Sequence, residues 1–330
     1  MVLQLSFACW DYDRMKAIED GRVRPEGVEL NFLNYRVEET FFRQLRFQEF
    51  DVSELSLSSY VITLNQENPP FIALPVFPSR FFRHQSIYIN KTSGISKPED
   101  LYGKRIGIPE YQMTAAVWQR GIMEDDFKVP MTAVEFYTGA IEPSDRTRSA
   151  KVPHSLPEGV KVTAISAGQN LAQMLADGEL DAIFSATKPS SFYSSPNVDY
   201  LFRNFKEVEA EYFRRTKIFP IMHVIALKRS VYKSNPWIAK TLTKAFAQSL
   251  EMAYEPLYER GALRYMLPWL EQHVEETQSL MGEKWWRDGF EENKHVLDTF
   301  LTYHHRQGLS SRKFEAHELF APSALENFVL

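Results

Sequence analysis

Two arginines and a histidine follow an apolar run in the stretch FPSRFFRHQSIYIN (77–90), among three phenylalanines. If FIALPVF (71–77) forms a strand, Arg80, Arg83 and His84 follow its carboxyl end, the edge at which open α/β sheets bind ligands. An arginine can hold a carboxylate through two hydrogen bonds and can stack its plane on an aromatic ring. The pattern predicts a site for a small anion. The alternative is a surface loop whose arginines pair with neighbouring acids.

Two further residues that can move protons lie in apolar strands. Glu54 stands in DVSELSLSSY (51–60), and His223 stands in IFPIMHVIALK (218–228). An acid beside an apolar core is costly unless it is paired or functional. Glu54 is therefore expected either to take a proton from a ligand hydroxyl or to hold Arg80. His223 is either a hydrogen-bonded core residue or an acid–base group, and its crossover strand favours the second role.

Polar residues at three more strand ends are candidate ligand contacts. Ser56 and Ser58 stand where DVSEL turns into a helix, and Tyr111 and Thr114 stand at a similar junction in IPEYQMTAAVW (108–118). Helix starts leave backbone N–H groups free for an anion, although serine and threonine also simply cap helices. Lys188, in SATKPSS (185–191), follows another strand and is either a ligand contact or a solvated side chain.

Metal and nucleotide chemistry have no recognisable motif in this sequence. There is no HExxH, no cluster of acidic ligands and no phosphate-binding loop, so neither a metal nor a nucleotide cofactor is expected. Cys9 is the one cysteine, which excludes an internal disulfide and a cysteine metal cluster.

Composition limits the partners. The chain has 330 residues, a net charge of −5 and no polybasic tract, so neither nucleic acid nor an anionic membrane is an expected partner. No stretch approaches the about 18 apolar residues that cross a bilayer. The start, MVLQLSFACWDYDR, lacks a basic region before its apolar run and predicts a strand rather than a secretory signal. A cytoplasmic protein is expected.

The elements that position these residues alternate between strands and helices. Strands are predicted at VLQLSFA (2–8), VELNFLN (28–34), DVSEL (51–55) and FIALPVF (71–77), with helices at 37–47 and 57–66 between them. This alternation is typical of an α/β fold with a largely parallel sheet. The pattern restarts near residue 90, and RTRSAKVPHSLPEG (146–159) is the best loop candidate.

The end of the chain is predicted to be rich in helices, at 234–259 and 282–308. The apolar stretches ALRYMLPWLEQHV (262–274) and EKWWRDGF (283–290) are expected either in a core or in a homo-oligomer contact.

This order of elements resembles the type II periplasmic-binding-protein fold. PEDLYGKRIGIPE (98–110) is similar to the turn into the first strand of that fold's inserted domain, and LADGELDAIFSATKP (175–189) is similar to its return strand. The resemblance implies a discontinuous domain I (1–88 plus 222–330, with the C-terminal helices), an inserted domain II (89–221) and a ligand cleft between them.

Within that fold the chain resembles the 4,5-dihydroxyphthalate decarboxylase family. The resemblance rests on FDVSELSLSSY (50–60), PVFPSRFFRHQSIYIN (75–90) and IFPIMHVIALKRSVYKSNPW (218–237). It implies a cytoplasmic lyase of phthalate degradation, a decarboxylase without organic cofactor that converts 4,5-dihydroxyphthalate to protocatechuate and CO2. The implied partner is a small aromatic carboxylate.

The resemblance assigns roles to the residues singled out above. Arg80 and Arg83 would hold the carboxylates, and Ser56, Ser58, Tyr111, Thr114 and Lys188 would bind the substrate. His84 or His223, as imidazolium, would protonate the ring, and the other histidine or Glu54 would take the phenolic proton. One alternative is a solute-binding protein that holds an aromatic or pyrimidine acid without turnover. A related lyase acting on another carboxylated ring is a further alternative.

Overall fold

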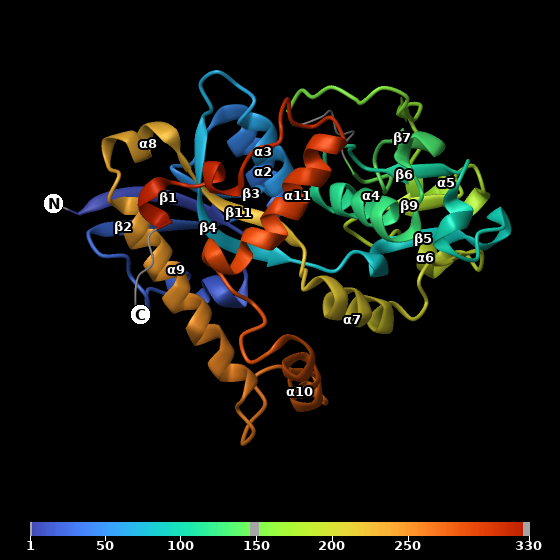
Figure 1. Ribbon diagram of the computed structural model, residues 1–330. Coiled ribbons are helices and arrows are strands. Elements are labelled where there is room, and N and C mark those ends of the chain that lie inside the picture. Colours follow the sequence, from blue (N-terminus) through green and yellow to red (C-terminus); the bar gives the residue numbers. More distant parts are fainter. Residues whose placement is uncertain (1, 146–151, 326–330) are drawn as a thin grey trace. The chain divides into compact units, whose positions relative to one another are not determined.

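The computed structural model describes residues 2–145 and 152–325, which fall into two compact units (Figure 1). Unit 1 comprises the chain up to Arg80, Ile221–Asp298 and the segment from Phe314 onward, and unit 2 comprises Phe81–Pro220 and Thr299–Lys313. The boundary expected after residue 88 lies later in the chain than the one after Arg80. Residues 299–313, expected in domain I, are part of unit 2.

Unit 1 is built on a five-stranded sheet in the order β2-β1-β3-β11-β4. Its strands are β1 (Leu3–Cys9), β2 (Val28–Asn34), β3 (Val52–Ser56), β4 (Phe71–Arg80) and β11 (Ile221–Lys228). β1 pairs in parallel with β2 and β3, whereas β11 runs antiparallel between β3 and β4. The first and last thirds of the chain therefore share one sheet.

Helices complete unit 1 and cover its apolar positions. They are α1 (Lys16–Glu19), α2 (Val37–Phe47), α3 (Leu57–Thr63), α8 (Arg229–Ser234), α9 (Ile238–Tyr254), α10 (Leu270–Met281) and the first turns of α11 (Lys294–Arg306). Helix α9 presents Ile238, Leu242 and Phe246 to the same core as Phe7 of β1 and Val52 of β3. The rings of Phe7 and Phe246 lie 5.3 Å apart. As predicted from its apolar spacing, α9 is an amphipathic core helix.

Unit 2 has a six-stranded sheet in the order β10-β5-β9-β6-β7-β8. Its strands are β5 (Ile87–Asn90), β6 (Arg105–Ile108), β7 (Glu135–Thr138), β8 (Lys161–Ala164), β9 (Ala182–Phe184) and β10 (Val198–Tyr200). Its helices are α4 (Thr114–Phe127), α5 (Leu171–Asp177), α6 (Ser191–Ser194) and α7 (Phe205–Thr216). Gly178 ends α5 with a φ of 79°, a backbone conformation that favours glycine.

Aromatic packing explains why residues 299–313 belong to unit 2. The buried Trp118 of α4 contacts the rings of Phe300 and Tyr303 at 5.5 and 5.7 Å. Gly121, one turn further along α4, leaves the space that the Tyr303 ring fills, since a Cβ there would lie 2.1 Å from that ring. Gln307 adds hydrogen bonds to Arg120 and to a carbonyl of α4. These contacts were not visible in the local sequence pattern.

The predicted C-terminal helix at 282–308 is partly wrong, because α11 begins only at Lys294. Gly282 and Gly289 have φ values of 92° and 97°. These values are incompatible with a helix, so no helix can run continuously from 282 to 293. Of the loop predicted at 146–159, residues 146–151 lie outside the described residues, and 152–159 contain no helix or strand.

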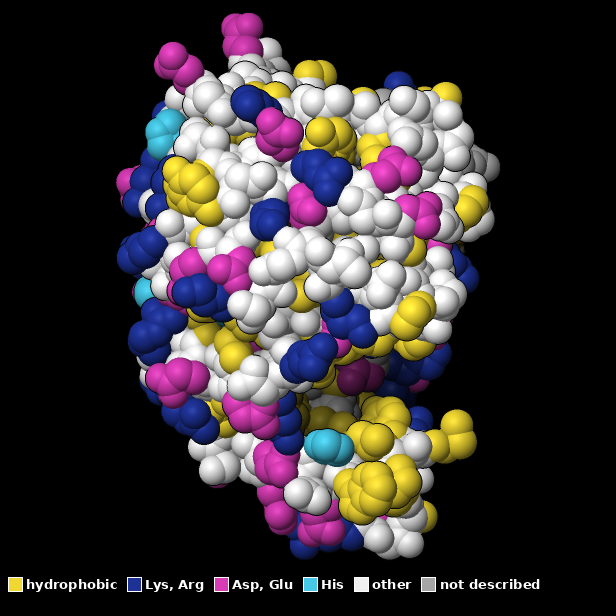
Figure 2. All heavy atoms as spheres, turned by 90° about the vertical axis from the view of Figure 1, so that its right-hand side faces the viewer, with side chains coloured by type: hydrophobic (Ala, Val, Ile, Leu, Met, Phe, Trp, Pro, Cys, Tyr) yellow, Lys and Arg dark blue, Asp and Glu magenta, His cyan; other side chains and the backbone are white. Residues whose placement is uncertain are grey.

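Charges on the surface are mixed. Figure 2 shows basic and acidic side chains interspersed over one face of the molecule, without a broad field of one sign.

In the segment 258–269 several large apolar side chains are exposed: Tyr258, Leu263, Met266, Leu267 and Trp269. None of the described helices has the length and apolar content needed to cross a bilayer.

Gly121→Ala is expected to destabilise unit 2 by about 1–3 kcal/mol, because the added methyl group must displace the Tyr303 ring. Urea unfolding followed by tryptophan fluorescence measures this loss. Gly261→Ala is the control, since Gly261 is exposed and a Cβ there would meet only the Glu259 side chain. Identical unfolding curves for the two variants would contradict the packing described above.

Candidate active site

The register of three strands places Glu54 and His223 together. Glu54 of β3 lies opposite Ile225 of β11, so His223, two residues earlier, is its diagonal neighbour on the same face. In β1, Ala8 pairs with Ser53, which brings Cys9 beside Glu54. Ile225 and Cys9 both belong to the apolar core of unit 1. Glu54 is therefore a fully buried acid at the end of an apolar sheet face.

Three hydrogen-bond donors converge on the Glu54 carboxylate. The Tyr12 hydroxyl donates to Oε1 at 2.6 Å, and the Nδ1 atom of His223 lies 2.6 Å from the same oxygen. The backbone N–H of Trp10 donates to Oε2 at 3.1 Å, and the Cys9 thiol lies 3.7 Å from that oxygen. Each carboxylate oxygen thus has at least one good donor, as a buried charge requires.

These donors outweigh burial in setting the pKa of Glu54. Burial alone would raise this pKa, but the charge of His223 and the hydrogen bonds from His223, Tyr12 and Trp10 lower it below its ordinary value. The carboxylate is therefore ionised at neutral pH. An ionised Glu54 accepts the Nδ1–H of His223, which fixes the orientation of the imidazole ring.

The remaining nitrogen of His223, Nε2, is available for chemistry. Its side chain is 17% exposed, and no described residue forms a hydrogen bond to Nε2. The ring of Phe41 in α2 contacts the imidazole edge to face, at 4.9 Å between centroids. A histidine held by a buried carboxylate through one nitrogen can give or take a proton through the other. This is the strongest acid–base arrangement among the predicted site residues.

Sequence reasoning missed Trp10 and Tyr12. Both stand in CWDYDR (9–14), directly after β1. A polar and aromatic segment at the carboxyl end of the first strand is a signal that could have identified them, because parallel strands end at one edge of a sheet. Neither the Trp10 N–H nor the Tyr12 hydroxyl could be assigned to Glu54 without knowing that β1 lies next to β3.

Ser56 also lies close to the pair in register, since it is directly opposite His223. Its hydroxyl accepts the N–H of Ser59 at 3.4 Å and caps α3, which is the simpler of its two predicted roles. Ser58 is fully buried in the first turn of α3. Ligand contact by either serine stays a prediction.

Arg80 contacts its own unit. Its Nη2 donates to the carbonyl of Arg287 at 2.7 Å and to the side chain of Asn293, and its guanidinium lies over the Phe77 ring. Burial lowers the pKa of Arg80 to about 10, which leaves it charged at neutral pH. The alternative pairing of Glu54 with Arg80 is not what the structure shows, because Glu54 binds His223. Carboxylate binding by Arg80 stays a prediction.

Arg83 and His84 are both buried in unit 2. Burial lowers the pKa of Arg83 to about 9. Burial, together with the charge of Arg215, lowers the pKa of His84 to about 4, so this imidazole is neutral at pH 7. Its Nδ1 lies 3.9 Å from Glu209, whose pKa burial raises to about 7. His84 is therefore much less suited than His223 to act as an imidazolium donor.

The other predicted contacts in unit 2 occupy separate surroundings. The Tyr111 ring lies under the Arg120 guanidinium at 3.8 Å, and Thr114 is buried at the start of α4. The Lys188 ammonium lies over the rings of Phe192 and Tyr200, at 4.3 and 4.7 Å. Ligand binding by Tyr111, Thr114 and Lys188 stays a prediction.

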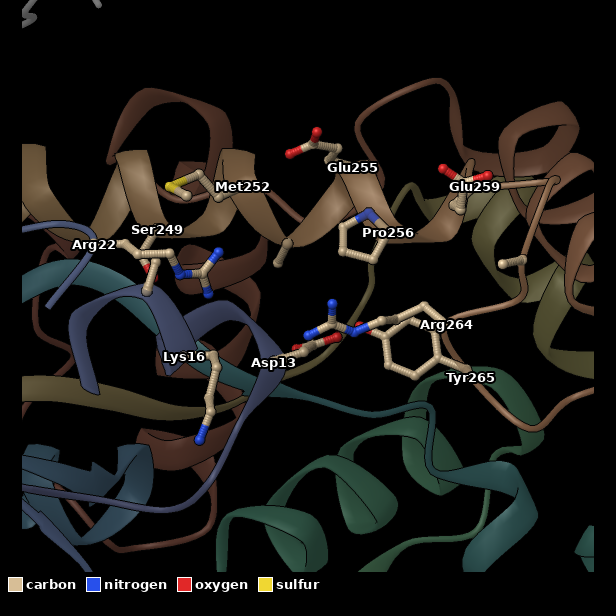
Figure 3. A pocket seen from close by; sticks show the side chains of 13 residues that line it. Asp13, Lys16, Arg22, Ser249, Met252, Glu255, Pro256, Glu259, Arg264 and Tyr265 are labelled. Atoms are coloured by element: carbon tan, nitrogen blue, oxygen red, sulfur yellow. The ribbon is translucent and has the colours of Figure 1, made fainter. Parts of the chain in front are cut away.

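A pocket of about 550 Å³ in unit 1 is lined in part by Asp13, the residue that follows Tyr12 in the sequence. Figure 3 shows that charged side chains of both signs line it, among them Asp13, Lys16, Arg22, Glu255 and Arg264. The lining does not include Glu54 or His223. Within the described part of the chain, no group of three or more histidine, cysteine, aspartate or glutamate side chains is arranged to hold a metal ion.

Comparison with known proteins finds similarity along nearly the whole chain. The chain is 42% identical over 327 residues to a 4,5-dihydroxyphthalate decarboxylase of Comamonas testosteroni, covering 99% of this chain and 98% of that protein. The chain belongs to the 4,5-dihydroxyphthalate decarboxylase family. A second decarboxylase of that name, from Pseudomonas putida, is 42% identical over 64% of this chain and 82% of its own length. No family model matches the sequence.

Solved structures confirm that this decarboxylase-family chain has a periplasmic-binding-protein fold. A putative sulfonate-binding protein of Methylobacillus flagellatus superposes with a TM-score of 0.57 at 13% identity, covering 98% of this chain and 93% of that one. The aliphatic sulphonate binding protein of Escherichia coli gives 0.53 at 10% identity, with 98% and 99% covered. At such low identity the likeness establishes the fold alone.

Glu54→Gln is expected to lower the free energy of unfolding by about 1–3 kcal/mol at pH 7, because an amide cannot accept all three donors. The lowered pKa of Glu54 means that its stabilisation is present above about pH 4.5 and is lost as pH falls through the folded-state pKa. The difference in the free energy of unfolding between wild type and Glu54→Gln should therefore become smaller from pH 7 to pH 3. Urea unfolding at each pH measures it.

Glu39→Gln is the control, since the Glu39 side chain is 52% exposed in a surface ion pair with Arg43. If the difference in the free energy of unfolding between wild type and Glu54→Gln stays constant between pH 7 and pH 3, Glu54 is not ionised in the folded protein.

Proposed function

We propose that this chain is a carboxy-lyase that converts 4,5-dihydroxyphthalate to protocatechuate and CO2. The observation that carries the proposal is the 42% identity to a 4,5-dihydroxyphthalate decarboxylase, because it spans 99% of this chain and 98% of that protein. The buried Glu54–His223 pair supplies the acid–base group that the reaction needs. Such an activity belongs to the breakdown of phthalate.

The substrate itself favours proton-driven loss of CO2. In 4,5-dihydroxyphthalate each ring carbon that bears a carboxylate has a hydroxyl group para to it. A proton added to that carbon forms a C–H bond while the hydroxyl oxygen donates electron density into the ring. The C–C bond to the carboxylate then breaks, CO2 leaves, and the bonding pair restores the aromatic ring. The ring takes up the electrons itself, so this step uses no organic cofactor.

His223 is the proposed proton donor. Its Nδ1 is bound to Glu54, whose negative charge stabilises the imidazolium, and Nε2 would carry the proton to the ring carbon. His84 is set aside for this role because burial lowers its pKa to about 4. Glu54 is fully enclosed, so it acts through His223 rather than by removing the phenolic proton directly.

Substrate binding requires cations for the carboxylates. Arg80, Arg83 and Lys188 stay proposed for this task, the first two because they remain charged although buried. Ser56, Ser58, Tyr111 and Thr114 stay proposed as partners of the substrate's polar groups. Arg83 is a better residue to mutate than Arg80 in a test of carboxylate binding. Arg80 also holds the 287–293 segment of unit 1 through hydrogen bonds to Arg287 and Asn293, so its replacement would disturb the fold as well.

His223→Gln should reduce kcat for 4,5-dihydroxyphthalate by about 10²–10⁴-fold, the usual loss when a general acid is removed. Turnover is measured as CO2 release together with protocatechuate formation by purified protein. His273→Gln, which changes an exposed histidine of α10, is the matched control and should keep full activity. Tight binding of the diacid by the wild type without CO2 release would instead identify a solute-binding protein.

Arg83→Met should raise KM for the diacid by about 10-fold or more, because a charged hydrogen bond contributes about 1.5–3 kcal/mol. The kcat value should change less, since Arg83 is proposed to bind the carboxylate rather than to move a proton. Steady-state kinetics with hydroxylated mono- and dicarboxylates separate the two constants. An unchanged KM would remove Arg83 from the binding site.

A further inference from the structure

Two donors share one oxygen of Glu54, and only one of them belongs to the reacting histidine. The Tyr12 hydroxyl and His223 Nδ1 both lie 2.6 Å from Oε1, and they lie 3.4 Å from each other. We propose that Tyr12 is a positioning residue that sets the acid strength of His223 by competing with it for Oε1. The consequence for catalysis rests on the proposed function, whereas the competition itself does not.

The Tyr12 hydroxyl is held in place for this contact. The Arg14 guanidinium lies over the Tyr12 ring at 4.1 Å and over the Trp286 ring at the same distance. Arg14 is fixed in turn by hydrogen bonds to the carbonyl of Pro78. Burial, followed by the charge of Glu54, raises the pKa of Tyr12 far above its ordinary value, so the hydroxyl keeps its proton and remains a donor.

The direction of the effect follows from charge sharing. A carboxylate oxygen that accepts a second hydrogen bond has less negative charge to offer the first donor, so it holds the imidazolium proton of His223 less tightly. Tyr12 therefore makes His223 a stronger acid than Glu54 alone would. Without the hydroxyl, Oε1 would bind His223 more strongly and the imidazolium would release its proton at a higher pH.

Among the residues that the structure describes, the other groups around Glu54 and His223 do not compete for Oε1. From β1, the Cys9 thiol faces Oε2, and burial raises its pKa, so it is neutral. From the segment after β1, Trp10 donates its N–H to Oε2, and the charge of Arg14 faces the Tyr12 ring. Helix α2 contributes Phe41, which carries no charge. Tyr12 is thus the group through which the oxygen bound to His223 is adjusted.

The test is the titration of His223 in ligand-free wild type and in Tyr12→Phe, followed by NMR of the imidazole carbon-bound proton. The chain has 8 histidines, and the His223 signal is the one lost in His223→Gln. The midpoint in Tyr12→Phe should rise by about 0.5–1 pH unit, the equivalent of one hydrogen bond. Tyr60→Phe is the control, since it removes a buried hydroxyl of unit 1 that is bound to Leu319 instead.

Activity gives a second, separate readout. In Tyr12→Phe, kcat on the low-pH plateau should fall several-fold with KM unchanged, and the pH at which the rate declines should move upward with the His223 midpoint. A His223 midpoint that is the same in Tyr12→Phe and wild type would overturn the proposal. If the His223 midpoint is shifted in Tyr12→Phe but the wild type releases no CO2, the proposed function is refuted and the effect of Tyr12 on His223 stands.

Discussion

The candidate active site depends on keeping one carboxylate ionised inside an apolar sheet face. Glu54 is fully buried, and an isolated charge there would cost several kcal/mol. The Tyr12 hydroxyl, the Trp10 N–H and His223 offset that cost by donating to both carboxylate oxygens. Because two of the donors come from the segment after β1 and the third comes from β11, the charge also requires those parts of the chain to meet at β3. The contacts that stabilise the Glu54 carboxylate are thus the same ones that hold the proposed proton donor.

The order of the strands explains why the buried carboxylate holds a histidine that is a candidate acid–base group. β3 lies between β1 and β11, so an acid on β3 can receive donors from both neighbours. The backbone register makes His223 the diagonal neighbour of Glu54, which engages one imidazole nitrogen and leaves the other available to a ligand. A fold shared with sulfonate-binding proteins thereby carries the proposed proton donor on β11 of its five-stranded sheet.

Much of this arrangement could be predicted from the sequence. The strands β1 to β4 and the helices α2, α3 and α9 follow from apolar spacing, and Glu54 and His223 stand out because each interrupts an apolar strand. Trp10 and Tyr12 could not be assigned, since their contact with Glu54 joins segments more than 40 residues apart. Local patterns also could not show that Arg80 binds the 287–293 segment, that burial neutralises His84, or that Tyr303 packs against Gly121.

The most direct test of the mechanism is the fate of the proton. Reaction of 4,5-dihydroxyphthalate with the purified protein in D2O, followed by NMR of the protocatechuate formed, reports where hydrogen enters the ring. Protonation by His223 predicts one deuterium at C6, the carbon that lost its carboxylate, and almost no labelled product from His223→Gln in the same time. Labelled protocatechuate formed equally fast by His223→Gln would contradict the role given to the Glu54–His223 pair.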